Sequence, residues 1–416
     1  MKTIGNIHHL KLTTVTPVSI GGDQGSLLSP YSDYVVSTNG ASLHYIHPDK
    51  LEQAVAEKEL LDEYVTYIQT GFDNNRSKFD LRQFITGRMK MNLETITRFS
   101  VANHGILHEQ RIEVKPIVKS AGRAFLPGSS VKGAMRTAML YDWLVKSKEG
   151  EQAMKQYFSN LRHWEKMEDE IQELKNQRGD YSARERMKDL KRKITSIERE
   201  LFNEDKLFGT LRDDAGQDSR RIRISDSGFA SAWEAHCLRR IRLLPMRAQA
   251  QPGSDIPILM EALPVGQQFR LDMMIEPPLS HPPLAYLESK ETSAILKNLN
   301  NFTLDSLAYE SYELGEANNR DNEEDIERLK DFYDILQARA ESGEVFLRLG
   351  FGKTIYDNSL ALALYNGGEE QESLEAFKRL RKLVWEKRLF EDDIYPMTRT
   401  ITSDGMPLGW VKVSAV

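Results

Sequence analysis

Short segments in which polar and apolar residues alternate recur along the 416-residue chain. In residues 7–15, Leu10 and Leu12 alternate with Lys11 and Thr13. The same period of two predicts strands in residues 221–225, 237–247, 267–276 and 344–349, each with one buried face. Residues 34–37 and 407–413 also predict strands, and we expect the second of these at a sheet edge.

Much of the chain between these strands has apolar residues at the spacing of a helix. It predicts helices over residues 48–68, 129–146 and 372–386, and within the stretch that ends at Glu341. The mixture, with neighbouring strands of antiparallel type, predicts an α+β fold. The order of elements fits a split β-α-β unit of the ferredoxin-like kind.

A long charged segment, residues 151–205, predicts an inserted helical hairpin. Met187, Leu190, Ile194, Ile197 and Leu201 keep a 3-4-3-4 spacing. Gly179 is a suitable helix end, and Ser182 with Glu185 predicts a capping box for the second helix. We therefore divide the chain into a core at 1–150 with an insertion at about 48–119, the hairpin at 151–205, and the rest of the core at 206–416.

Composition excludes several classes of protein. Cys237 is the single cysteine, which excludes an internal disulfide and a multi-cysteine zinc site. No apolar run reaches the roughly 18–20 residues of a membrane span, and the first residues lack the apolar core of a signal peptide. We therefore expect a cytoplasmic protein without membrane contact. The net charge of −6 leaves room for a local basic track that binds nucleic acid.

The stretch 126–136 (LPGSSVKGAMR) predicts a tight turn that leads directly into a helix. Pro127 and Gly128 end the preceding segment, and Ser129 or Ser130 is expected to cap the helix. Lys132 and Arg136, four residues apart, share one face, away from the apolar stripe of Val131, Met135, Ala138 and Met139. The N-terminus of a helix carries a partial positive charge, and small residues in front of it let a phosphate group approach the backbone N–H groups. The alternative is a capped amphipathic helix whose cations face water.

A second Gly-rich turn with cations follows the strand at 344–349. It contains Arg348, Gly350, Gly352 and Lys353. Neither turn is a nucleotide-binding P-loop: Gly133 follows Lys132 where Ser or Thr is required, and Leu347 stands where the second turn would need Gly. Ile355 also stands where a dinucleotide fingerprint needs its third Gly.

Candidate catalytic and metal-binding residues are few. His104 and His108 are four apart, but no Glu follows His104 and no nearby Cys completes a metal site, so we expect no metal. His8 and His9 are adjacent and should face opposite sides of a strand. Asp23 and Asp33 lie in the loop after the first strand, where a carboxylate could align attack by a ribose 2′-hydroxyl. Polar loops commonly contain Asp for solvation alone.

Taken together, these segments resemble the RAMP superfamily of CRISPR proteins, and within it the family of subunits that cap the backbone of type III-A (Csm) effector complexes. Residues 127–133 (PGSSVKG) carry the resemblance to the superfamily, and the Gly-rich strand end and the tail narrow it to this family. The matching segments are residues 12–21, 31–34, 127–133, 207–209, 223–226, 348–352 and 407–411.

The resemblance implies a ferredoxin-like (RRM-like) core with helical insertions, at the end of a filament of related subunits. Such a protein would bind the 3′-proximal part of the guide RNA (crRNA), support crRNA maturation and antiviral defence, and need no cofactor. It would contact the repeated backbone RAMP subunit, the small helical subunit and possibly target RNA. It would not be an enzyme. The expected RNA-binding residues are Gly128, Ser129, Ser130, Lys132, Gly133, Arg136, Arg348, Gly350, Gly352 and Lys353.

Two other functions stay open from the residues alone. A metal-independent endoribonuclease that trims guide precursors would need His8, His9, Asp23 or Asp33. A structural adaptor would instead bind proteins through the hairpin at 151–205.

Overall fold

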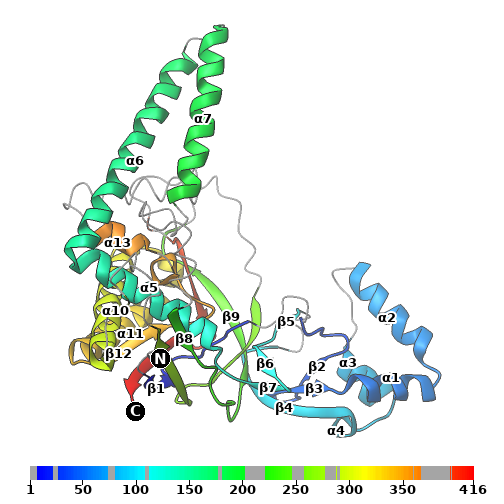
Figure 1. Cartoon of the computed structure of the whole chain (residues 1–416). Coiled ribbons are helices and arrows are strands. Elements are labelled where there is room, and N and C mark those ends of the chain that lie inside the picture. Colours follow the sequence, from blue (N-terminus) through cyan, green and yellow to red (C-terminus); the bar gives the residue numbers. More distant parts are fainter. Residues whose placement is uncertain are drawn as a thin grey trace.

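The computed structural model describes residues 7–21, 27–73, 80–107, 112–176, 180–201, 221–245, 257–276, 287, 291–358, 360–366, 394 and 396–416 (Figure 1). Its strands are β1 (Ile7–Thr14), β2 (Tyr34–Val36), β3 (Ser42–Ile46), β4 (Thr97–His104), β5 (Val114–Lys115), β6 (Lys119–Ser120), β7 (Arg123–Ala124), β8 (Ile222–Ile224), β9 (Glu234–Arg242), β10 (Ile258–Ala262), β11 (Gln268–Ile275), β12 (Val345–Arg348), β13 (Thr398–Thr402) and β14 (Trp410–Ala415).

The α-helices are α1 (Pro48–Glu57), α2 (Leu61–Asp73), α3 (Leu81–Gln83), α4 (Leu93–Ile96), α5 (Gly128–Lys146), α6 (Lys148–Lys175), α7 (Tyr181–Leu201), α10 (Thr292–Gly315), α11 (Glu323–Glu341), α12 (Ile355–Asn358) and α13 (Ala361–Asn366). A π-helical turn covers Phe84–Arg88, and a 3-10 turn covers Arg320–Asn322. None of the helices in the described part of the chain has the length and hydropathy to cross a bilayer.

A five-stranded sheet forms the centre of the core, in the order β12-β14-β1-β11-β8. All four neighbouring pairs are antiparallel. It follows that β1, β8 and β12 run in one direction, while β11 and β14 run in the other. The segments that leave β8 and β12 therefore emerge at the same end of the sheet.

Helices α5 and α10 pack with this sheet. The predicted stripe on α5 is confirmed, because Val131, Met135, Ala138 and Met139 are all fully buried. They join Leu10 and Leu12 of β1 in the largest apolar cluster. A second apolar cluster contains Phe346 of β12, Trp410 of β14 and side chains of α11. Since Val345 and Leu347 belong to the first cluster, β12 is covered on both faces.

A second sheet carries the insertion and has the order β2-β3-β4-β9-β10-β5. Strand β9 is its longest member, and two strands share one of its sides. Strand β4 pairs with residues 234–236 of β9, and β13 pairs with residues 238–242. Helices α1 to α4 pack on the β2-β3-β4 part of this sheet through their own apolar cluster.

The predicted hairpin is confirmed: α6 and α7 pack side by side and project away from the rest of the molecule (Figure 1). Met167, Ile171 and Leu190 form a small apolar cluster between the helices. Asp180, rather than Ser182, caps α7, since its Oδ1 accepts from the Ser182 N–H at 2.8 Å. The predicted capping box is therefore wrong. Gly179 lies outside the described residues.

The other sequence predictions have mixed outcomes. The strands at 7–15, 221–225, 237–247, 267–276 and 344–349 are confirmed with small shifts. The helix predicted at 48–68 is two helices, α1 and α2. The predicted edge strand near the C-terminal end is wrong, because β14 lies between β12 and β1. The helix predicted at 372–386 lies outside the described residues.

Candidate functional site

Helix α5 begins at Gly128, with Pro127 in the N-cap position. The Gly128 N–H donates to Oδ1 of Asp226 at 2.7 Å, and Asp226 follows strand β8. The hydroxyl groups of Ser129 and Ser130 do not cap the helix, so that prediction is wrong. A carboxylate from another part of the chain supplies the negative charge that a helix start favours.

Gly128 is buried against β8 rather than open to a ligand. A Cβ atom at this position would lie 2.2 Å from the carbonyl oxygen of Ile224. Glycine is therefore required here because the helix start and the strand approach each other closely. We remove Gly128 from the expected RNA contacts, since its N–H is already bonded within the protein.

The residues after Gly128 form an accessible basic surface. Ser129 and Gly133 are exposed, and Ser130, Lys132 and Arg136 are half-buried. Burial lowers the pKa of Lys132, and the positive charges of Arg136 and Arg223 lower that pKa further. Arg223 lies on the neighbouring strand β8 and pairs with Glu276 at 2.8 Å. Three cations from two elements thus converge beside the start of α5.

An exposed aromatic residue lies on the segment that joins β8 to β9. The Phe229 side chain is 45% exposed, and the Arg123 guanidinium carbon lies 4.4 Å from its ring centroid. Backbone bonds hold this segment against the residues before α5: Ala230 N–H donates to the Ala124 carbonyl at 2.7 Å. Cations next to an accessible ring are the groups that contact phosphates and stack on bases.

We call this region the α5-tip surface. It consists of Arg123, Ser129, Ser130, Lys132, Gly133, Arg136, Arg223 and Phe229. Sequence reasoning identified its α5 residues from their spacing. It missed Arg123, Arg223 and Phe229, because backbone pairing such as the bridge between Phe125 and Phe229 brings segments together that are far apart in the sequence. Arg123 itself, a basic residue two positions before Phe125, was the local feature in the sequence that could have indicated this part of the surface.

The second Gly-rich turn joins three chain segments. The Phe351 N–H donates to the Ser19 carbonyl at 2.8 Å. Gly350 has φ +65°, and a Cβ there would lie 2.0 Å from the same oxygen. Gly352 has φ +93°, and its Cβ would lie 2.9 Å from Leu408 Cβ. Both glycines therefore serve backbone conformation and close packing.

Arg348 is buried beneath this turn. Its guanidinium lies 2.9 Å from Asp357 and 3.7 Å from Glu310, and its Nε donates to the Leu408 carbonyl at 3.0 Å. Burial opposes its charge, but Tyr333, Asp357 and Glu310 raise the pKa of Arg348 above its usual value. Its side chain does not reach the surface, so we correct its predicted role from RNA contact to internal ion pairing.

Lys353 is the cation of this turn that stays half-exposed. Burial lowers its pKa, Asp357 raises it and Arg348 lowers it. The turn follows β12, at the opposite edge of the sheet from β8. Four strand spacings of about 4.8 Å separate the two edges by roughly 19 Å. The two predicted turns therefore lie at the same end of the sheet but do not form one cluster.

The candidate catalytic residues do not come together. His8 is buried and its Nδ1 lies 2.9 Å from Thr292 Oγ1, and burial lowers the pKa of His8. His9 is exposed on the other face, 2.7 Å from Asp272, so the predicted opposite orientation is confirmed. Asp33 accepts from the Ser29 N–H at 2.7 Å and stabilises its own turn. Asp23 and His108 lie outside the described residues.

The model of the RAMP superfamily matches residues 11–355, which include the α5-tip surface and the second turn. This chain belongs to the RAMP superfamily. The match contains the second half of β1, strands β8, β11 and β12, and helices α5 and α10, and thus most of the main core.

Two solved structures share the fold of this RAMP protein. One is a chain from the cryo-EM structure of a Csm–crRNA–target RNA ternary complex of a type III-A CRISPR-Cas system. It has a TM-score of 0.64 and 18% identity, over 98% of this chain and 100% of that one. The other is the crystal structure of Csm5 from T. onnurineus, with a TM-score of 0.57 and 16% identity over 96% and 99% of the chains. A search of curated proteins finds no match.

Proposed function

We propose that this RAMP protein is a non-catalytic, RNA-binding subunit of a type III-A Csm effector complex, and that it caps the backbone filament and binds the 3′-proximal part of the crRNA. The observation that carries the proposal is the α5-tip surface, where Lys132, Arg136 and Arg223 lie close to one another and the segment after β8 adds the exposed Phe229 ring with Arg123 over it. The likeness in fold to Csm5 and to a chain of a Csm complex with bound RNA supports this assignment.

The chemistry of the surface suits single-stranded RNA. Lys132, Arg136 and Arg223 offer positive charge to phosphates, and the exposed backbone at Ser129 and Gly133 allows a ribose-phosphate strand to approach the helix. Phe229 offers a face on which a base can stack. These contacts depend little on base identity, as expected for a subunit that must accept guides of any sequence.

We infer that the core is ferredoxin-like, with β12 added at one edge. Strands β1, β8, β11 and β14 lie in the order β14-β1-β11-β8, and helices α5 and α10 follow β1 and β11 in the chain. This is the sheet order 4-1-3-2 of a repeated split β-α-β unit. Because both Gly-rich turns lie at one end of this sheet, a guide strand that contacts the α5-tip surface can continue towards Lys353.

The absence of catalysis is part of the proposal. His8 is buried, His9 pairs with Asp272, and Asp33 is used by its own turn. We expect purified protein to leave a crRNA precursor intact in EDTA, the condition under which a metal-independent endoribonuclease would shorten it. The proposed partners are crRNA, target RNA, the repeated backbone RAMP subunit and the small helical subunit.

The test is RNA binding by Lys132→Ala and Arg136→Ala. Loss of two phosphate contacts should weaken crRNA binding and reduce the salt slope of the binding constant by about 0.7–0.9 per contact. Arg184→Ala and Lys188→Ala are matched controls, because these exposed cations have the same spacing on the distant helix α7. Equal affinity and an equal salt slope for both pairs of variants would contradict the proposal.

A second role is favoured by the hairpin. It projects from the core, and Tyr181 near its tip is 77% exposed (Figure 1). We propose that this arm contacts another protein subunit. Replacing residues 163–193 with a short Gly/Ser linker should then reduce co-purification with the other Csm subunits while RNA affinity stays unchanged. Full assembly by the shortened protein would exclude an adaptor role for the arm.

A further inference from the structure

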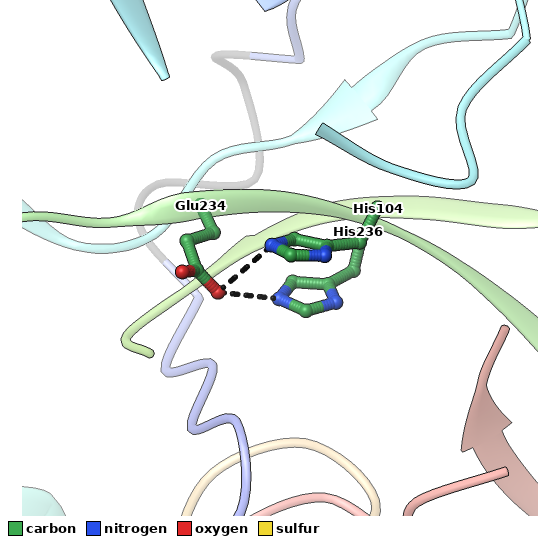
Figure 2. Close-up of side chains that lie close together, drawn as sticks. All are labelled: His104, Glu234 and His236. Atoms are coloured by element: carbon green, nitrogen blue, oxygen red, sulfur yellow. Dashed lines mark ion pairs between the residues drawn. The ribbon is translucent and has the colours of Figure 1, made fainter. Parts of the chain in front are cut away.

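Three metal-ligand side chains meet where the insertion joins strand β9. Strands β4 and β9 pair in parallel over three residues only, and His104 lies opposite His236 in this ladder. Glu234 precedes His236 by two residues, so both side chains lie on one face of β9. Figure 2 shows the Glu234 carboxylate directed at both imidazole rings.

The distances between these groups match those of a metal centre. Glu234 Oε2 lies 3.2 Å from His104 Nε2 and 3.3 Å from His236 Nε2. Potential ligand atoms of the three residues all lie within 4.8 Å of one another. Zinc binds histidine nitrogen and carboxylate oxygen at about 2.0–2.2 Å, and in a tetrahedral site this separates neighbouring ligand atoms by roughly 3.3 Å.

The cluster also has an internal polar group that a simple ion pair does not explain. The His236 side chain is only 5% exposed. Its buried Nε2, the atom that lies 3.3 Å from Glu234 Oε2, has no hydrogen-bond partner among the described residues. The two imidazole rings are stacked, with centroids 4.6 Å apart and an interplanar angle of 15°. A cation bound to Nε2 of both rings and to Glu234 Oε2 would compensate the burial of the His236 Nε2 atom and of the carboxylate.

We propose that His104, Glu234 and His236 bind one divalent transition-metal ion, with zinc as the best match to two imidazoles and a carboxylate. The fourth position is left to water, since His104 is the exposed member of the set. The ion links β4 of the insertion to β9 across a ladder of only three residue pairs. It therefore fixes the insertion, which carries α1 to α4, to the rest of the second sheet.

The test is zinc binding by the untagged full-length protein after removal of metal. Titration against a chromophoric chelator should show one tight equivalent of Zn²⁺ per chain. His104→Ala and Glu234→Gln should each weaken binding at least tenfold. His9→Ala is the matched control, because His9 forms an exposed pair with Asp272 at 2.7 Å and is not in the group of potential metal ligands found among the described residues.

A structural readout completes the experiment. Zinc should slow amide exchange in β4 of the wild-type protein and leave β4 of His104→Ala unchanged. The exposed position of His104 keeps this variant foldable even if a substitution of buried His236 is not. Binding of zinc by the His104→Ala/Glu234→Gln double variant as tight as by wild type, or no zinc binding by wild type, would overturn the proposal.

Discussion

Lys132 is a residue at which burial and neighbouring charge act in the same direction. Its pKa is lowered by partial burial and by Arg136 and Arg223. A phosphate that binds there would raise this pKa again, so RNA binding takes up a proton. Affinity should therefore fall as the pH rises through the lowered pKa of the free protein.

This pH dependence separates Lys132 from its neighbours. As the pH rises from neutral towards 10.5, the usual pKa of lysine, Lys132→Arg should lose less RNA affinity than wild type, because an arginine stays charged throughout this range. Filter binding along this pH series measures the difference, and both proteins are tested with the same RNA. Identical losses in the two proteins would show that Lys132 does not contact the phosphate.

Asp357 is the central acceptor of the buried ion network. It pairs with Arg348 at 2.9 Å and also accepts from the Thr354 N–H at 2.9 Å and from Ser306 Oγ at 3.0 Å. Asp357→Ala would leave the buried Arg348 charge incompletely compensated. We expect a loss of about 3–5 kcal/mol in the free energy of unfolding, measured by urea denaturation.

A surface pair provides the comparison. Arg88 pairs with Glu63 at 2.7 Å but is largely exposed. Arg88→Ala should therefore change the unfolding midpoint little, because solvent screens the pair. Similar effects of the two substitutions would mean that the internal network does not stabilise the core.

The burial of Arg348 could not be predicted from its own strand. In an alternating segment such as 344–349, a cation is expected on the solvent face. Strand β12 instead has apolar clusters on both faces, and the acidic partners Glu310 and Asp357 come from α10 and α12. The same limit applies to Asp226, whose capping role at Gly128 depends on a contact across 98 residues.

At the scale of elements, α5 has two glycines that differ in their surroundings. A Cβ on Gly128 would lie 2.2 Å from the Ile224 carbonyl, whereas no described heavy atom lies within 4 Å of a Cβ on Gly133. Gly128→Ala should force α5 away from β8 and cost about 1–3 kcal/mol of stability. Gly133→Ala should add roughly 0.5–1 kcal/mol, because alanine favours a helix more than glycine does.

The pair of variants also tests RNA approach to the helix. The Gly133→Ala protein should bind RNA more weakly than wild type although it is more stable. The reason is that the added methyl group lies at an exposed position, on the proposed path of the RNA strand. Thermal melts and filter binding on the same samples measure both effects. A gain in stability with unchanged RNA affinity would place the strand away from this turn of α5.

Elements with strong local periodicity were the predictable part of the fold. The inner stripe of α5 and the α6–α7 hairpin follow from helical spacing, and β1 and β11 from alternation. The position of β14 was not predictable, because its pairing of Val413 with Leu12 is set by packing between residues far apart in the chain. Strand β4 was not predicted, although its burial alternates along the strand, because Phe99 and Val101 are the only large apolar residues in it.

At the scale of the whole molecule, the hairpin and the core should unfold independently except near the base of α6. Met154 and Phe158 of α6 belong to the main apolar cluster, whereas Met167, Ile171 and Leu190 pack only with the hairpin cluster. Replacement of residues 163–193 should leave the stability of the core unchanged. Phe158→Ala should reduce it by about 3–5 kcal/mol.

Calorimetry of the two variants measures this division. The shortened protein should keep the main transition temperature of wild type, and Phe158→Ala should lower it. A lower transition temperature after removal of residues 163–193 would show that the arm supports the core, and would count against a role limited to contacts with other subunits.

The location of β14 between β1 and β12 has a consequence for synthesis. During translation, β1 leaves the ribosome long before the strand that covers one of its sides. Until β14 arrives, this side of β1 presents unpaired backbone groups, which favour association with other chains. We therefore expect the nascent protein to be prone to association until β14 has been made.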